Sequence, residues 1–269
     1  MTSTKAGFEG RVAVVVGAGQ SPSDVPNLVG NGRAIALTLS RAGAVVVCVD
    51  RDRAAAEATL AFVESEGGSG HAVQADIAIP EDARSLVDEA ISRYGRIDHL
   101  VLNAGISDRR PLAEVTAESW DAIFAVNLRG HMLCAEHALP RMSNGGSIVF
   151  VSSVAAFLPA ARNPAYEASK AALGALCRAV ALEGHPRSIR ANVVYAGLID
   201  TPMGRAAGRA RPERARGPLP FGRQGTAWEV ANAVRFLLSD DASYVNATGL
   251  VVDGGLSNGV VLNPTNGRG

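Results

Sequence analysis

The chain has no excess charge of either sign and few aromatic residues. Its 26 basic residues balance its 26 acidic residues, so no global charge favours nucleic acid or an anionic membrane as a partner. Only 5% of the residues are aromatic, which argues against an aromatic-rich recognition surface. The 29 glycines suit tight strand-to-helix turns and closely packed helices instead.

Cysteine and long apolar runs are equally scarce. The three cysteines, Cys48, Cys134 and Cys177, are odd in number, far apart and each within an apolar stretch. This pattern favours buried structural thiols over a disulfide or a metal site. No apolar run approaches the roughly 20 residues that span a bilayer, and the first residues lack the apolar segment of a signal peptide. We therefore expect a cytoplasmic protein that binds no metal and no membrane.

Short apolar runs alternate with helical patterns along the whole chain. Uninterrupted apolar runs are typical of parallel strands that are buried on both faces. The predicted strands are Val12–Val16, Ala44–Val49, His71–Gln74, Leu100–Leu102, Ile148–Val151, Ala191–Val194 and Leu250–Val252. The predicted helices lie near 31–42, 52–66, 80–94, 115–139, 164–184 and 226–238. Because no linker divides the chain, the pattern predicts one α/β domain over residues 1–269, a doubly wound parallel sheet (Rossmann fold) with helices on both faces.

Two stretches interrupt this alternation and are predicted to be loops. The first is Ser21–Val29, and the second is Gly204–Gly217, within a substrate lid that we place near 203–219. The arginines of this lid either bind an acidic substrate or coat a solvated, mobile surface; we favour the second reading. They are Arg205, Arg209, Arg211, Arg214 and Arg216.

Glycines surround the turn from the first predicted strand to the first helix. A dinucleotide fold needs glycine there, because the backbone must approach the pyrophosphate at the helix N-terminus. Gly17 and Gly19 follow the strand, and Gly30 and Gly32 precede the helix. Without Ser21–Val29 the sequence becomes GAGQGNG, so we infer a nine-residue insertion in a phosphate-binding turn. The insertion either covers the cofactor and slows its release or is a harmless surface loop; the glycines themselves fit a cofactor turn better than a merely flexible loop.

Asp50 ends the second predicted strand, eighteen residues beyond Gly32. A carboxylate here accepts hydrogen bonds from the adenosine ribose of NAD and repels the 2′-phosphate of NADP. We therefore predict NAD as the cofactor. Two alternatives stay open, since Arg51 and Arg53 are placed to attract a phosphate and Asp50 is also placed to be a helix N-cap.

Tyr166 and Lys170 are four residues apart in a predicted helix and share one face. A free tyrosine, with a pKa of roughly 10, is a poor base at neutral pH, and a nearby ammonium group lowers that pKa. Ser153 follows the strand SIVFV, where its hydroxyl is placed to hold a substrate oxygen. Taken alone, a Tyr-x-x-x-Lys pair is more often a surface feature than a catalytic one.

The order of several motifs resembles that of the classical short-chain dehydrogenase/reductase family. They are GAGQ…GNG, Asp76, Asn103-Ala104-Gly105, Asn127, Ser152-Ser153, YEASK and VDGG, spread from Gly10 to about Leu256. The family resemblance implies hydride transfer between a nicotinamide cofactor and an alcohol or ketone. It also implies a homotetramer, whereas ordinary packing within one chain would equally explain the small residues of the helix that carries Tyr166.

The resemblance assigns roles to individual residues. Tyr166 exchanges the substrate proton and Ser153 positions the substrate oxygen. Lys170 binds the nicotinamide ribose, and Asn127 supports a water-linked proton relay behind it. Besides these residues, the four glycines and Asp50, the implied cofactor contacts are Asp76, Ile77, Asn103, Ala104, Gly105, Gly197, Ile199 and Thr201. The chain departs from the family pattern at Leu102 and Ala196, where the family usually has asparagine and proline.

The substrate itself is open at this point. Apolar residues at 154–158 favour a hydrophobic secondary alcohol or ketone, and a 3-oxoacyl thioester is an alternative. A protein that senses NAD(H) without turnover is a rival, although it has no need for all four catalytic residues. An enoyl reductase is expected to space the tyrosine and lysine more widely, and an epimerase to carry a larger substrate domain.

Overall fold

The computed structural model of the chain describes residues 7–158, 163–210 and 219–260. Its centre is a seven-stranded parallel sheet with the strand order β3-β2-β1-β4-β5-β6-β9. The strands are β1 (Val12–Val16), β2 (Val45–Asp50), β3 (Gly70–Gln74), β4 (Ile97–Leu102), β5 (Met142–Ser153), β6 (Arg190–Ala196) and β9 (Gly249–Val252). Each overlaps a run predicted from the sequence, although β2 begins at Val45 and not at Ala44, and the doubly wound fold is confirmed.

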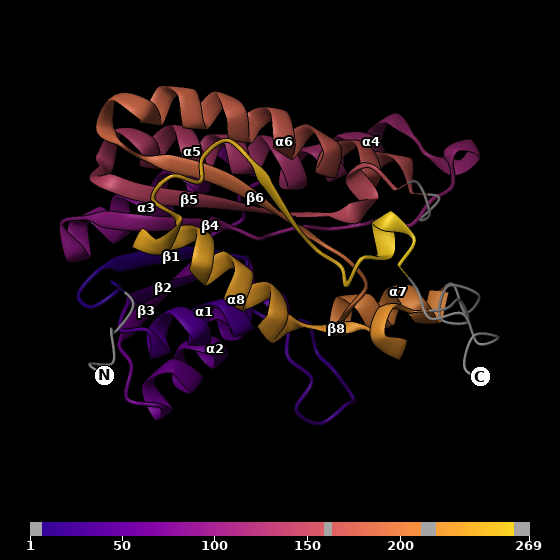
Figure 1. The fold of residues 1–269 in the computed structure, drawn as a ribbon, viewed down its shortest axis with the longest axis horizontal. Helices are drawn as coiled ribbons and strands as arrows, with labels where there is room; N and C mark the ends of the chain where they lie inside the picture. Colours follow the sequence, from indigo (N-terminus) through magenta and orange to yellow (C-terminus); the bar gives the residue numbers. More distant parts are fainter. Residues whose placement is uncertain (1–6, 159–162, 211–218, 261–269) are drawn as a thin grey trace.

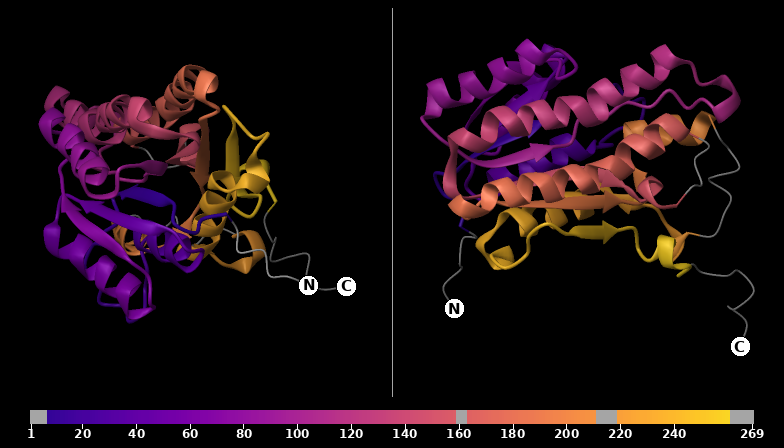
Figure 2. Two further views of the ribbon diagram at one scale, coloured as in Figure 1. Left: turned by 90° about the vertical axis from the view of Figure 1, so that its left-hand side faces the viewer. Right: turned by 90° about the horizontal axis from the view of Figure 1, so that it is seen from above.

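Helices cover both faces of this sheet (Figures 1 and 2). One face carries α3 (Pro80–Tyr94), α4 (Ala117–Phe124), α5 (His131–Ala138) and α6 (Pro164–Gly184). The other face carries α1 (Asn31–Arg41), α2 (Arg53–Ser65) and α8 (Ala227–Leu238). The helices form where apolar residues recur at helical spacing, and their apolar stripes pack on the sheet.

Alternate residues of each strand enter two separate cores. In β1, Val14 and Val16 pack towards α3, α5 and α6, whereas Ala13 and Val15 pack towards α1 and α8. Because both faces are buried, a parallel strand has no polar side, which explains the uninterrupted apolar runs. Burial of each such valine contributes roughly 1.5–3 kcal/mol.

The strand order reverses between β1 and β4. The chain runs from β1 through β2 to β3 on one side and from β4 to β9 on the other, so the connections after β1 and after β4 leave in opposite directions. In doubly wound sheets, ligands bind in the crevice outside the carboxyl ends of the strands at this switch point. The loops after β1 and β4 therefore define where a ligand is expected.

Two sequence predictions need correction. The stretch from Gly204 is not a loop at first, because helix α7 (Pro202–Ala210) occupies it; residues 211–218, with three of the predicted lid arginines, lie outside the described residues. The helix predicted over 115–139 is interrupted by a π-helical turn, Ala125–Gly130, between α4 and α5. A second small sheet pairs β7 (Ile199–Asp200) with β8 (Gly225–Thr226) just before α7 and α8.

The cysteines behave as predicted. Cys48, Cys134 and Cys177 are buried and free, and burial raises the pKa of each thiol to about 12. They are therefore inert packing residues. Among the helices of the described part of the chain, none combines the length and apolarity required to cross a bilayer.

Candidate active site

Tyr166 and Lys170 lie in the first turns of α6, which begins with Pro164 at a position where proline costs no hydrogen bond. The Lys170 side chain is buried, its Nζ donates to the carbonyl oxygen of Val151 at 2.9 Å, and it lies 5.8 Å from the centre of the Tyr166 ring. Burial lowers the pKa of Lys170 to about 8. An ammonium group in this position is a strong source of positive potential beside the phenol.

Ser153 is the last residue of β5, next to α6. Its Oγ accepts a hydrogen bond from the amide of Ala155 at 3.2 Å, which orients the hydroxyl at the carboxyl edge of the sheet. The neighbouring Ser152 donates from Oγ to the carbonyl oxygen of Lys170 at 2.8 Å. This bond fixes the first part of α6, and with it Tyr166, against the end of β5.

Asn127 lies within the π-helical turn and is fully buried. Its Oδ1 accepts from the amide of Ile106 at 2.8 Å, while its Nδ2 donates to the carbonyl oxygen of Ile106 and to Ser169 Oγ, both at 3.0 Å. Isolated π turns widen a helix locally and occur often at functional sites. Here the turn connects the segment after β4 with α6.

Gly105 lies between the two buried polar residues. A Cβ atom at this position would be 3.3 Å from Lys170 Nζ and 3.5 Å from Asn127 Oδ1. Glycine thus lets the backbone after β4 approach both side chains. The structure therefore gathers Asn127 and Lys170 around this segment, with the Tyr166 ring centred 5.8 Å from the Lys170 ammonium group and Ser153 on the adjacent strand.

The candidate cofactor turn shows the close backbone approach that glycine permits. A Cβ atom on Gly32 would lie 1.8 Å from the carbonyl oxygen of Gly17, and Gly17 itself has φ +80°. Asn103, at the end of β4, donates from Nδ2 to the same oxygen at 2.8 Å, and the amide of Ala104 bonds to Val16. The strands β1 and β4 and helix α1 thus meet at one point, the switch point of the sheet.

The residues present fit a dinucleotide at this point. The first turn of α1 carries no acidic residue, and its N-cap is Gly30, which has no side chain to cap the first amides. The helix therefore offers amide donors and positive potential to an anion. Gly30 differs from Gly17, Gly19 and Gly32 of the same turn. A Cβ atom on Gly30 would make only ordinary van der Waals contacts, the nearest 3.6 Å away on Gln20.

Asp50 points back to the glycine turn. Its Oδ2 accepts from the amide of Gly19 at 2.9 Å and its Oδ1 accepts from the amide of Asp52 at 3.1 Å. The N-cap of α2 is Asp52, not Asp50, so the capping alternative is wrong. Arg53 pairs with Glu57 in its own helix, which removes one of the two arginines that could compete for a phosphate.

The remaining predicted cofactor residues lie at the same carboxyl edge. Asp76 and the buried Ile77 follow β3, and Asp76 Oδ1 accepts from the amide of Ala78 at 3.0 Å. Gly197 follows β6, beside the end of β5, since Ser153 is in register with Ala196. The next predicted contacts, Ile199 and Thr201, are buried, and Thr201 Oγ1 accepts from the amide of Gly204 to cap α7.

The residues predicted to line a substrate pocket differ in their exposure to solvent. Val154 and Ala155 are buried, whereas Phe157 is 51% exposed and contacts Tyr195 edge to face with ring centres 5.3 Å apart. Leu176 and Val180 of α6 pack on the core of this chain.

Sequence reasoning missed several supporting side chains. Ser169 Oγ donates to the carbonyl oxygen of Tyr166 at 2.8 Å and accepts from Asn127. His131 Nε2 lies 2.9 Å from the carbonyl oxygen of Ala104, and burial, with the charge of Lys170, lowers its pKa to about 3. The sequence could have indicated His131, because it follows Asn127 by four residues in one predicted helix, a spacing that places two side chains on the same face.

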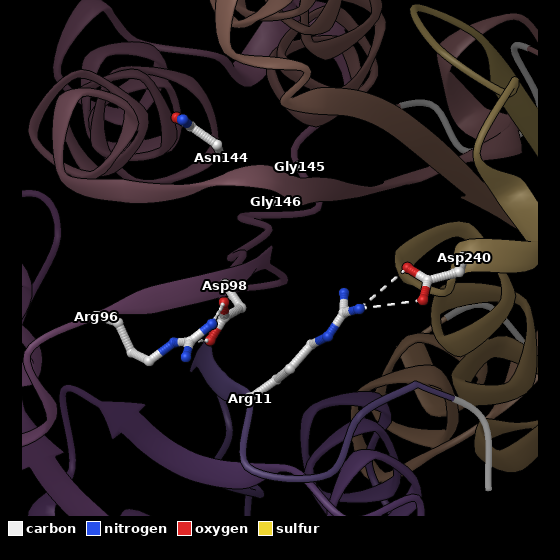
Figure 3. Close-up of a pocket in the computed structure, with 7 residues that line it drawn as sticks. All are labelled: Arg11, Arg96, Asp98, Asn144, Gly145, Gly146 and Asp240. Carbon is white, nitrogen blue, oxygen red and sulfur yellow. Dashed lines mark hydrogen bonds and ion pairs between the residues drawn. The ribbon is translucent and has the colours of Figure 1, made fainter.

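A pocket of about 270 Å³ lies away from these residues (Figure 3). It opens at the amino ends of the strands. Its charged side chains neutralise each other, because Arg11 pairs with Asp240 and Arg96 pairs with Asp98. No unbalanced charge is left to hold an ionic ligand. Nor do the described residues place three or more His, Cys, Asp or Glu side chains together as a metal site would require.

The fold and the site define an oxidoreductase of the Rossmann type. A family model described as enoyl-(acyl carrier protein) reductase matches residues 27–257. The chain is 37% identical to cyclopentanol dehydrogenase of a Comamonas species over 81% of this chain and 88% of that enzyme. The chain belongs to the classical short-chain dehydrogenase/reductase family.

Solved structures agree with this assignment. Levodione reductase is 34% identical, with a TM-score of 0.85 over 93% of this chain and 99% of that one. A blue fluorescent protein from a metagenomic library, solved in complex with NADPH, is 33% identical, with a TM-score of 0.83 over 92% and 98% of the two chains.

Proposed function

We propose that the chain is an NAD-dependent dehydrogenase that interconverts a secondary alcohol and a ketone, with Tyr166 as the acid/base. The observation that carries this proposal is the buried Lys170 one helical turn from Tyr166. Burying an ammonium group is costly unless it is hydrogen-bonded or serves a purpose. Its only described hydrogen bond goes to a single backbone carbonyl, of Val151, so its charge remains available to the site.

The proposed chemistry assigns one task to each side chain. The bound nicotinamide supplies the hydride acceptor or donor. Ser153 holds the substrate oxygen beside Tyr166, and Tyr166 takes the hydroxyl proton during oxidation or returns it during reduction. The positive charge of Lys170 stabilises the negative charge on the Tyr166 oxygen when the proton leaves. Asn127 fixes the backbone at Ile106 and supports a water-linked proton relay behind Lys170.

For the cofactor we propose NAD rather than NADP. Asp50 is held at the turn by the Gly19 amide, so its carboxylate faces the place where an adenosine ribose would lie. The cofactor contacts we propose are those predicted above, including Gly17, Gly32, Asp76 and Thr201. The NADPH complex of a relative makes NADP the alternative that experiment must test.

For the substrate we propose a cyclic or other hydrophobic secondary alcohol. Support comes from the small apolar residues after Ser153 and from relatives that act on cyclic compounds, such as cyclopentanol dehydrogenase and levodione reductase. The alternative is an acyl thioester, in line with the name of the matching family model. We also propose that the enzyme is a single catalytic domain and a homotetramer, which light scattering during gel filtration will test.

The proposal is tested by following NADH absorbance with a panel of cyclic ketones and 3-oxoacyl thioesters. Tyr166→Phe should lose about 10²–10⁴-fold in kcat, the usual contribution of one general acid/base, while NADH binding measured by fluorescence persists. Tyr244→Phe, at a fully exposed tyrosine, is the matched control. Turnover that survives in Tyr166→Phe, or binding of NADH without turnover of any substrate, contradicts the proposal; the second result would favour a sensor.

A further inference from the structure

The loop Ser21–Val29 lies on one side of the switch-point crevice and the segment after β4 lies on the other. The loop follows β1, and the segment that contains Arg109 follows β4. These two strands are neighbours in the sheet, with their carboxyl ends at the same edge. A ligand in the crevice is therefore flanked by both segments.

Helix α7 contacts both sides. Arg209 Nη1 of α7 lies 3.5 Å from Asp24 Oδ1 of the loop. On the other side, Arg109 Nη1 donates to the carbonyl oxygen of Ala206 at 3.0 Å. In Figure 1 the loop, drawn in indigo below the sheet, and α7 lie at the same end of the molecule. Helix α7 thus bridges the two sides of the crevice.

The loop is held so that Asp24 is presented to α7. Gln20 closes its base, since Oε1 accepts from the amide of Gly30 at 2.8 Å and Nε2 donates to the carbonyl oxygen of Leu28 at 2.9 Å. Near the tip, Ser23 Oγ accepts from the amide of Val25 at 3.1 Å. Two prolines in the loop restrict its backbone further.

The negative charge of Asp24 also acts on a second arginine of α7, Arg205. The pKa of Arg205 is raised, mainly by its hydrogen bond to Asp200 and to a smaller extent by the charge of Asp24. Asp24 is the only acidic residue of the loop. Arg205 itself is paired with Asp200, so the α7 arginine that forms an ion pair with Asp24 is Arg209.

We propose that Asp24 and Arg209 are positioning residues that hold α7 across the crevice, so that a bound cofactor leaves only after their ion pair has opened. This inference rests on the proposed function. It gives the insertion a specific partner, the helix that follows the predicted nicotinamide contacts Ile199 and Thr201. Cofactor retention and the substrate side of the site are then coupled through one contact.

The contact of α7 with Asp24 is weaker than its contact with Arg109. This difference predicts which side of the crevice α7 leaves first. Asp24 and Arg209 are 77% and 65% exposed, so water and salt screen their attraction. The Arg109 side chain is partly buried. Helix α7 should therefore release the loop first and stay attached to the segment after β4.

The test measures dissociation of NADH by stopped-flow fluorescence, without substrate. Exposed ion pairs contribute little, so Asp24→Asn and Arg209→Gln should each accelerate release by about two- to fivefold. The double variant should be no faster than either single variant, and added salt should accelerate release from the wild type more than from the variants. Asp240→Asn, which breaks another exposed ion pair at the opposite edge of the sheet (Figure 3), should release NADH at the wild-type rate.

A charge exchange separates the ion pair from other effects of these substitutions. Asp24→Arg combined with Arg209→Asp should restore slow release, whereas each change alone should not. In the protein without nucleotide, hydrogen exchange of the amides at 205–209 should rise in Asp24→Asn but not in Asp240→Asn.

Equal release rates in the wild type, Asp24→Asn and Arg209→Gln overturn this inference while leaving the proposed function intact. Additive effects in the double variant, or a charge exchange that fails to slow release, overturn it as well. A wild-type protein that binds neither NADH nor NADPH overturns the proposed function and the inference together.

Discussion

Replacement of Asp50 should move the enzyme from NAD towards NADP. The structure holds this carboxylate by the amide of Gly19 at 2.9 Å, which fixes it at the end of β2. We expect a ribose hydroxyl of NAD to donate a hydrogen bond to this carboxylate. A hydrogen bond to a charged group contributes about 1.5–3 kcal/mol, so Asp50→Ala should lower kcat/KM for NAD by about 10- to 150-fold.

The same substitution removes repulsion of the 2′-phosphate. A group with about two negative charges at about 5 Å from a carboxylate in water is destabilised by roughly 1–2 kcal/mol, so NADP should gain about 5- to 30-fold. The two effects together change the preference by about 50- to 4,500-fold. The exposed Arg51 is then free to attract the phosphate.

The structure also shows a side effect that the assay must separate. Asp50→Ala leaves the Gly19 amide without its acceptor and loosens a turn that both cofactors use. This loss affects NAD and NADP equally and cancels in the ratio of their kcat/KM values, which is the quantity to measure. Asp50→Asn, which keeps an acceptor for the Gly19 amide without the charge, should shift the ratio in the same direction. A wild-type enzyme that prefers NADP, or a ratio that stays constant in both variants, would refute the reasoning.

Three further predictions concern the turn, the loop and the core. Gly32→Ala should abolish folding or cofactor binding, because its Cβ would meet the carbonyl oxygen of Gly17 at 1.8 Å, whereas Gly30→Ala should be tolerated; nucleotide titration and thermal unfolding of both variants will show this. Deletion of 21–29 should preserve the fold and weaken NAD binding in calorimetry, and an unchanged Kd would mean that the loop is a surface excursion. Burial lowers the pKa of His99 to about 4, so its neutral form stabilises the fold above pH 6.5 and this contribution is lost as the pH falls towards 4. About 2 kcal/mol should disappear between pH 7 and pH 5, and urea unfolding of His99→Leu should lack that part of the decline.

The strands of the sheet could be predicted from the sequence because both of their faces are buried in apolar cores. Residues such as Val14 and Val15 face different cores, yet both are buried, and an uninterrupted apolar run records this directly. The family motifs were equally readable, since the positive φ of Gly17 and the close approach of Gly32 to the carbonyl oxygen of Gly17 both exclude a side chain.

Helix α7 was missed because its glycines and arginines were interpreted as loop residues, although its sequence does carry an amphipathic helical pattern. Its start was nevertheless encoded, since Thr201 caps the helix and Pro202 occupies its first position. By contrast, nothing in the local sequence shows that Gln20 spans the base of the loop or that Asp24 meets Arg209. Those contacts join segments whose distance is set by the fold alone.

The positions of Asn127 and His131 depend on the number of residues in the π-helical turn, Ala125–Gly130. Each residue of an α-helix advances the helix by about 100°. The wider π turn takes up one extra residue, so loss of one residue from 125–130 with a return to α-helical winding would leave α5 in nearly the same orientation relative to α4. His131 would keep its contact with Ala104, whereas Asn127 would leave the widened turn and lose its bonds to Ile106. A single-codon deletion in this stretch should therefore be more harmful than most substitutions, because the length of the segment, and not only its composition, positions Asn127 in the candidate site.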